Sequence, residues 1–148
     1  MAKVLVVYST KTGTTEAMAE SLAEGLRETG TDATVIDAKD VKGELDMAGY
    51  DVYLFGSPTY HHEMIEDMKR LLLVAERADL QGKTGGVFGA YGWSGESLKK
   101  MHEKMEYRCG MEMLEDRLPM KVPIGDEALR RASREFGRKL GGRISGRE

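Results

Sequence analysis

The stretch YSTKTGTTEAMAE, residues 8–20, joins a short apolar run to a helical pattern. The run before it, Val4–Val7, is apolar and rich in β-branched residues, which favours a buried strand at Lys3–Tyr8. After it, apolar residues recur at helical spacing, so we expect a helix at Thr15–Glu28 that stops at Gly30. Residues 9–15 hold four threonines, one serine, one glycine and one lysine. The sequence therefore places a hydroxyl-rich loop where a strand meets a helix.

A loop of this composition in this place suits a phosphate group. The backbone N–H groups at the start of a helix lack intrahelical partners, and the helix dipole favours an anion there. The hydroxyls add neutral donors, and Gly13 allows the backbone to approach a ligand closely. The loop has neither the G-x-x-x-x-G-K-[ST] pattern of nucleoside triphosphatases nor the G-x-G-x-x-G pattern of dinucleotide-binding folds. A capped loop with solvated hydroxyls is the alternative.

The rest of the chain alternates between strand and helix patterns. Further strands are expected at Asp32–Asp37, Asp51–Gly56, Thr84–Tyr91 and Glu112–Leu118, the last with a polar pattern typical of a sheet edge. Further helices are expected at Met64–Arg77, Glu96–Arg108 and Asp126–Leu140, followed by a frayed end at residues 141–148. This alternation predicts an α/β fold with parallel strands and helices on both faces. Ligands of such folds bind at the carboxyl ends of the strands.

Composition and charge exclude several classes of protein. The 148 residues suffice for one domain, 1–148, and carry a net charge of −3. Residues 1–126 hold 15 Lys and Arg against 22 Asp and Glu, which argues against nucleic acid; the basic residues 127–148 suit a solvated helix face better than a contact patch. Cys109 is the single cysteine, so no disulfide framework is expected. Without a long apolar run or a signal peptide, no membrane contact and a cytoplasmic location are expected.

Two further segments at predicted strand ends carry aromatic residues. GSPTYHH, residues 56–62, holds a tyrosine and two histidines, and GAYGWSG, residues 89–95, holds Tyr91 and Trp93 among glycines. Aromatic rings on loops expose apolar surface unless they stack on another ring or pack on the body of the protein. Stacking would make these segments the walls of a site for a flat aromatic ligand. Packing of Tyr91 and Trp93 onto the domain is the alternative.

Together, the three segments resemble the flavodoxin family, and most of all the flavodoxin domain of flavodiiron proteins, whose pattern has GSPT followed by G-[AS]-[YF]-G-W-[SG]-G. The likeness covers nearly the whole chain. It implies a flavodoxin-like sandwich with a five-stranded parallel sheet in the order 2-1-3-4-5 and one non-covalently bound FMN. By this resemblance the phosphate loop comprises Ser9, Thr10, Lys11, Thr12, Gly13 and Thr14, with Thr15 at its end. The ring-flanking segments comprise Ser57, Pro58, Thr59, Tyr60, His61 and His62 on one side, and Gly89, Ala90, Tyr91, Gly92, Trp93, Ser94 and Gly95 on the other.

Lys11 departs from the many flavodoxins that place neutral donors in this loop. Its ammonium either strengthens phosphate binding or points to solvent. The histidines are too few for the histidine and carboxylate cluster of flavodiiron proteins, and Glu66 stands where the zinc motif H-E-x-x-H would need its second histidine. We therefore expect no metal site. No nucleophile or general base stands out, so no catalytic residue is expected either.

A flavin domain of this kind is expected to carry electrons between redox proteins, from ferredoxin-type donors to low-potential acceptors. The alternative within the same fold is an FMN-dependent NAD(P)H or quinone reductase. A phospho-signalling receiver domain would need paired acidic residues at the end of the first strand, where Val7, Tyr8 and Ser9 stand instead. A flavin-free interaction module would be colourless.

Overall fold

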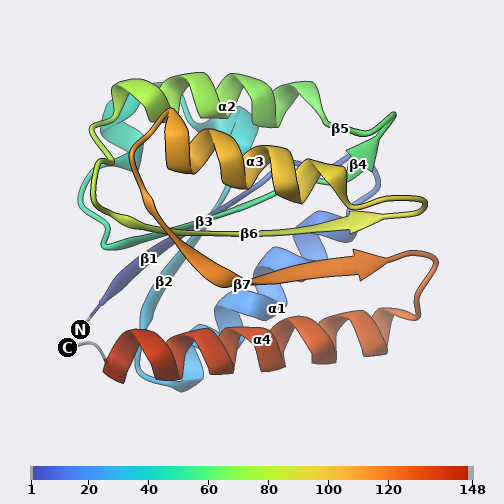
Figure 1. The fold of residues 1–148 in the computed structure, drawn as a ribbon. Helices are drawn as coiled ribbons and strands as arrows, with labels where there is room; N and C mark the ends of the chain where they lie inside the picture. The colour runs from blue at the N-terminus through green and yellow to red at the C-terminus, as the bar shows by residue number, and fades with distance from the viewer. Residues whose placement is uncertain (1, 147–148) are drawn as a thin grey trace.

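The computed structural model describes residues 2–146 and contains a five-stranded parallel sheet in the order β2-β1-β3-β6-β7 (Figure 1). Its strands are β1 (Lys3–Tyr8), β2 (Asp32–Asp37), β3 (Val52–Gly56), β6 (Thr84–Tyr91) and β7 (Glu112–Lys121). The predicted order 2-1-3-4-5 is confirmed, because β4 (Thr59–Tyr60) and β5 (Glu63–Met64) form a separate antiparallel hairpin. The polar strand β7 lies at the edge, as predicted.

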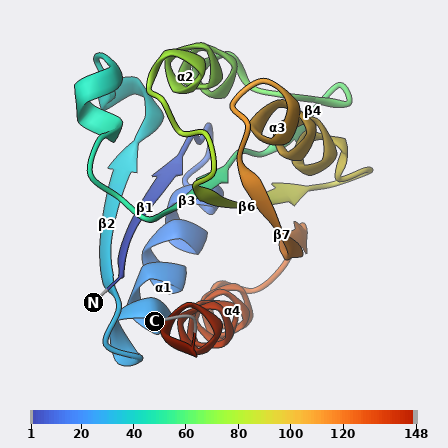
Figure 2. The same ribbon diagram turned by 60° about the vertical axis from the view of Figure 1, so that its left-hand side comes forward.

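Helices cover both faces of the sheet. Figure 2 shows α1 (Thr14–Glu28) and α4 (Asp126–Gly146) on one face, and α2 (Glu66–Arg77) and α3 (Glu96–Tyr107) on the other. Two short 3₁₀ helices, η1 (Ala38–Asp40) and η2 (Glu44–Met47), follow β2. Alternate residues of β1 point to opposite faces of the sheet. Leu5 and Val7 pack in the core under α2 and α3, and Val4 and Val6 pack in the core under α1 and α4. A strand buried on both faces explains its continuous apolar run.

The close packing of α4 on α1 corrects the expected end of the last helix. The sequence predicted fraying from Gly141, but α4 continues to Gly146. Glycines bring the two helix backbones together: a Cβ at Gly25 would lie 2.0 Å from the carbonyl oxygen of Arg134, and one at Gly137 would lie 2.1 Å from that of Leu22. Gly141 likewise lies against the side chain of Thr29. These glycines allow close contact between α1 and α4, and Gly141 does not end the helix.

Two other boundaries also differ from the predictions. Helix α2 begins at Glu66 rather than Met64, because Met64 pairs with Thr59 in the hairpin and the N–H of Ile65 donates to Ser57 Oγ at 3.2 Å. Strand β7 continues past Leu118 to Lys121, because it stays paired with β6 as far as Tyr91. The remaining predicted helices and strands begin and end within one residue of the expected bounds, whereas β4, β5, η1 and η2 were not predicted.

Five of the six basic residues of α4 form ion pairs with carboxylates of the described residues. Arg130 and Arg131 pair with Asp126 and Glu127 one turn earlier in the same helix. Arg138 pairs with Glu28 of α1, and Lys139 and Arg143 pair with Asp116 of β7. Much of the positive charge of residues 127–146 is therefore balanced locally, which supports the interpretation of this helix face as solvated rather than as a contact patch.

Candidate functional site

The loops that follow β1, β3 and β6 meet at the carboxyl edge of the sheet. The N–H of Ser9 donates to the carbonyl of Gly56 at 2.9 Å, and the N–H of Ser57 donates to the carbonyl of Phe88 at 3.2 Å. Gly89 lies so close to the loop after β3 that a Cβ there would be 2.0 Å from the carbonyl oxygen of Ser57. The parallel topology thus brings the three predicted segments together.

The first loop presents polar groups at the start of α1. Gly13 occupies the N-cap position with φ of 90°, a left-handed conformation that suits glycine, and it has no side chain with which to cap the helix. Thr10 Oγ1 accepts a hydrogen bond from the Gly13 N–H at 2.9 Å, and the hydroxyls of Thr12 and Thr14 lie 3.2 Å apart. Thr15 is fully buried, and its Oγ1 has no partner within residues 2–146. The helix N-terminus therefore keeps donors available for an anion.

The second segment comprises residues 57–58 and the β4–β5 hairpin that follows them. Ser57 is fully buried and its Oγ accepts from the Ile65 N–H, which fixes where the hairpin returns. The hydroxyls of Thr59 and Ser97 lie 2.5 Å apart and tie the hairpin to the first turn of α3. His61 and His62 form the turn itself and both have positive φ, 51° and 65°.

The third segment consists of the last three residues of β6 and the loop that follows, and it contacts the hairpin through His62. Nδ1 of His62 lies 3.3 Å from Ser94 Oγ and 3.2 Å from Glu96 Oε1, an oxygen of the first residue of α3. Trp93 stands between Gly92 and Ser94 with 91% of its surface exposed. The alternative in which Trp93 packs the loop onto the domain is therefore wrong, whereas Tyr91 is half-buried.

Lys11 connects the first loop to the second. Its Nζ lies 4.7 Å from the centre of the Tyr60 ring, in cation–π distance. Tyr60 itself is 38% exposed. Lys11 is exposed and joins the hydroxyl-rich loop to the hairpin. Its contact with a phosphate stays a prediction.

The sequence analysis missed a fourth segment at this edge. Residues 122–125 follow β7, and Val122, Pro123 and Ile124 line a cavity of about 350 Å³ together with Thr12, Gly13, Thr14, Asp126 and Arg130. The parallel topology could have predicted this segment, because a parallel β7 must end at the same edge of the sheet as the other strands. Arg130 brings a guanidinium, paired with Asp126 at 3.0 Å, to the side of the hydroxyl-rich loop.

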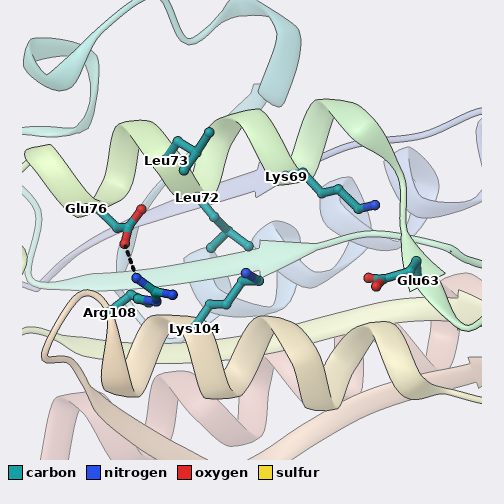
Figure 3. A pocket seen from close by; sticks show the side chains of 7 residues that line it. All are labelled: Glu63, Lys69, Leu72, Leu73, Glu76, Lys104 and Arg108. Atoms are coloured by element: carbon teal, nitrogen blue, oxygen red, sulfur yellow. Dashed lines mark ion pairs between the residues drawn. The ribbon is translucent and has the colours of Figure 1, made fainter.

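Cavity size does not single out the site. A cavity of about 410 Å³ lies beside Lys11, Tyr60 and His61. A second of the same volume lies between α2 and α3, where Leu72 and Leu73 are framed by charged side chains and Glu76 pairs with Arg108 (Figure 3). Of these two cavities, the one beside Lys11 touches both the hydroxyl-rich loop and an aromatic ring, so chemistry rather than volume distinguishes it.

Titratable groups near the sheet offer little reactive chemistry. Burial, followed by the neighbouring Glu16 carboxylate, raises the pKa of Tyr8, whose hydroxyl donates to Glu16 at 3.0 Å. Burial raises the pKa of the Cys109 thiol to about 11 and lowers that of His102. Across residues 2–146, no three His, Cys, Asp or Glu side chains cluster as metal ligands would, and no helix has the length and apolar character needed to cross a membrane.

Comparison with known proteins identifies the family. The sequence model described as Flavodoxin matches residues 6–136. The chain is 36% identical to a flavodoxin of Maridesulfovibrio salexigens over 132 residues, covering 85% of this chain and 84% of that one. It superposes on a flavodoxin from the domain Archaea with a TM-score of 0.84 and 29% identity, covering 97% and 99% of the two chains.

The resemblance to flavodiiron proteins is also confirmed, for part of those proteins. The flavodiiron protein from Giardia intestinalis superposes with a TM-score of 0.82 and 26% identity, covering 97% of this chain but only 36% of that chain. The chain therefore matches a flavodoxin over its length and a flavodiiron protein over about a third. This chain belongs to the flavodoxin family, whose cofactor is FMN.

Proposed function

We propose that this protein is an electron carrier that accepts electrons from ferredoxin-type donors and passes them to low-potential acceptor proteins. Family membership supports an FMN-based electron-transfer function. The observation that carries the proposal further is the exposure of Trp93, on a segment tied to the hairpin by His62. An aromatic side chain left 91% exposed at the carboxyl edge can cover one face of a flavin ring while the ring edge stays accessible to a partner.

The residues at this edge fit FMN. The buried hydroxyl of Thr15, which has no partner among residues 2–146, and the N-terminus of α1, which the N-cap glycine leaves without a side-chain cap, suit the phosphate. Tyr60 on one side and Trp93 on the other suit the two faces of the ring. We assign the phosphate to residues 9–15 and the ring to residues 57–62 and 89–95. When bound, FMN supplies the redox chemistry, and the protein sets its position, its access and its electrostatic surroundings.

The acidic body determines how partners approach. Residues 1–126 carry seven more acidic than basic side chains, so positively charged patches on partners would be attracted. Counter-ions screen such attraction beyond about 10 Å at 0.1 M salt, so rates of electron transfer should fall as ionic strength rises. Cytoplasmic location and organisation as one domain stay predictions from the sequence.

The test begins with purification and identification of any released flavin. A colourless protein that takes up no FMN in a titration would refute the proposal. The next step is stopped-flow reduction by a ferredoxin-type donor, run beside steady-state assays with NAD(P)H and quinones. Rapid transfer between proteins with negligible turnover of small molecules supports an electron carrier. Efficient NAD(P)H-to-quinone turnover would assign the protein to the reductase class instead.

A further inference from the structure

Ser97, in the first turn of α3, is a buried polar residue outside the three segments assigned to the flavin. Its side chain is fully buried. Its Oγ lies 2.5 Å from Thr59 Oγ1, at the short end of the range for hydrogen bonds between hydroxyls, and its N–H donates to the same Thr59 oxygen at 3.4 Å. Ser97 therefore joins α3 to the first strand of the β4–β5 hairpin.

The same hydroxyl also helps to fix the backbone just before the hairpin. Ser97 Oγ donates to the carbonyl oxygen of Ser57 at 3.4 Å. The N–H of Ser57 donates to the Phe88 carbonyl at 3.2 Å, and Ser57 Oγ donates to the Pro58 carbonyl at 2.9 Å. Pro58 has no N–H of its own to hold the segment in place. The conformation of residues 57–58 thus depends on a few contacts, and Ser97 supplies one of them.

We propose that Ser97 is a positioning residue that holds residues 57–59 in the conformation that receives the FMN ring before FMN binds. FMN in this statement rests on the proposed function, whereas the hydroxyl contacts belong to the protein itself. Ser97 acts through Thr59, which pairs with Met64 in the hairpin, and through Ser57, whose Oγ accepts from the Ile65 N–H where the hairpin returns. No contact between Ser97 and the ring is needed.

Loss of the Ser97 hydroxyl should therefore affect how often the ring site is ready to bind. Loss of one hydrogen bond changes an equilibrium constant about two- to tenfold. If residues 57–59 spend less time in the binding conformation, the competent fraction of the protein falls, and the apparent dissociation constant rises by the same factor. A smaller competent fraction slows association of the ligand, whereas the complex, once formed, dissociates at nearly its former rate.

Hydrogen exchange in the flavin-free, full-length protein tests the positioning role without any ligand. The amide of Ile65 reports on the segment, because it donates to Ser57 Oγ at 3.2 Å. In S97A, exchange of this amide should be about two- to tenfold faster. Unchanged exchange at Ile65 would overturn the proposal.

Ser133→Ala is the matched control. Ser133 is also fully buried, and its hydroxyl donates to the Leu129 carbonyl at 2.8 Å, but it belongs to α4 on the other face of the sheet. S133A removes the same hydroxyl from a buried helical serine, so it controls for a general loss of stability. Exchange at Ile65 should stay unchanged in S133A, and equal acceleration in both variants would overturn the proposal.

Binding kinetics with riboflavin give the second test. Riboflavin lacks the phosphate and so isolates the ring end of the site, and quenching of its fluorescence in a stopped-flow experiment follows binding. S97A should lower the association rate constant about two- to tenfold and leave the dissociation rate constant nearly unchanged, whereas S133A should change neither. A rise in the dissociation rate constant at an unchanged association rate constant would show that the hydroxyl acts only in the complex, and would overturn the proposal.

Thr59→Val tests the partner through which Ser97 acts. Valine keeps the shape of threonine and removes its hydroxyl, so T59V should slow riboflavin association as S97A does. A protein with both substitutions should associate no more slowly than the slower single variant, because both remove the same contact. Additive losses would contradict the proposal. If the unsubstituted protein binds neither riboflavin nor FMN, the proposed function is refuted, whereas hydrogen exchange at Ile65 decides on the positioning of residues 57–59.

Discussion

Replacing Thr15 by valine should separate phosphate binding from folding. The Thr15 side chain is fully buried in the first turn of α1, and its hydroxyl has no partner among residues 2–146. Valine has nearly the same shape and removes only the hydroxyl. Leaving such a group unsatisfied costs about 1–3 kcal/mol, so T15V should raise the free energy of unfolding of the flavin-free protein by about 1 kcal/mol.

With FMN bound, the same substitution should have the opposite effect. A hydrogen bond to a charged group contributes about 1.5–3 kcal/mol, so T15V should raise the FMN dissociation constant about 10- to 150-fold. Riboflavin has no phosphate, and its affinity should hardly change. Urea unfolding without flavin measures the first effect, and quenching of flavin fluorescence on titration measures the second.

Thr12→Val is the control for the effect of removing a threonine hydroxyl from this loop on stability. Thr12 is exposed and its Oγ1 lies 3.2 Å from Thr14 Oγ1, so its loss should bring no gain in stability. If T15V weakens FMN and riboflavin equally, the loop acts through folding rather than through the phosphate. If T15V leaves FMN affinity unchanged, the phosphate is not bound at the start of α1, and our assignment of residues 9–15 is wrong.

Three further predictions concern other parts of the molecule. In urea unfolding, Gly137→Ala should lower the free energy of unfolding by about 1–3 kcal/mol, because the new Cβ would lie 2.1 Å from the Leu22 carbonyl oxygen. Gly142→Ala is the control, because a Cβ there meets open space, and it should leave the free energy of unfolding unchanged or raise it. Trp93→Ala should weaken FMN binding and reduce the quenching of FMN fluorescence; no change in either would exclude stacking. Cys109 should react slowly with iodoacetamide at about pH 8 in the folded protein, because its thiol is buried with a pKa of about 11.

Much of the fold follows from periodicity, and the exceptions have physical causes. Continuous apolar runs and helical spacings predict elements that bury a core. The β4–β5 hairpin was missed because each of its strands has two residues, and His61-His62 lacks the composition typical of its turn. The end of α4 was misjudged because a glycine can equally stop a helix or allow close packing, and only the position of Thr29 distinguishes the two.

The sequence predicts which loops form the site, but it does not predict the side-chain contacts between them. Parallel strands require their carboxyl ends to meet, so the three segments could be assigned to one place from their order alone. Side-chain partners depend on distances between loops far apart in sequence. Nothing in the sequence places Lys11 over Tyr60 or His62 beside Glu96, and residues 122–125 lack the hydroxyl or aromatic composition that drew attention to the other loops.

The β4–β5 hairpin is the element on which the geometry of the site depends. It receives Lys11 from the loop after β1, and it contacts Ser94, Glu96 and Ser97 through His62 and Thr59. The loop after β1 and the segment after β6 are thus both joined to the hairpin through side chains. Since the strands below are rigidly packed, movement at this edge must be largely movement of these loops against one another. A change in the hairpin should therefore alter the phosphate and ring ends of the site together, whereas a change in Thr15 should alter the phosphate end alone.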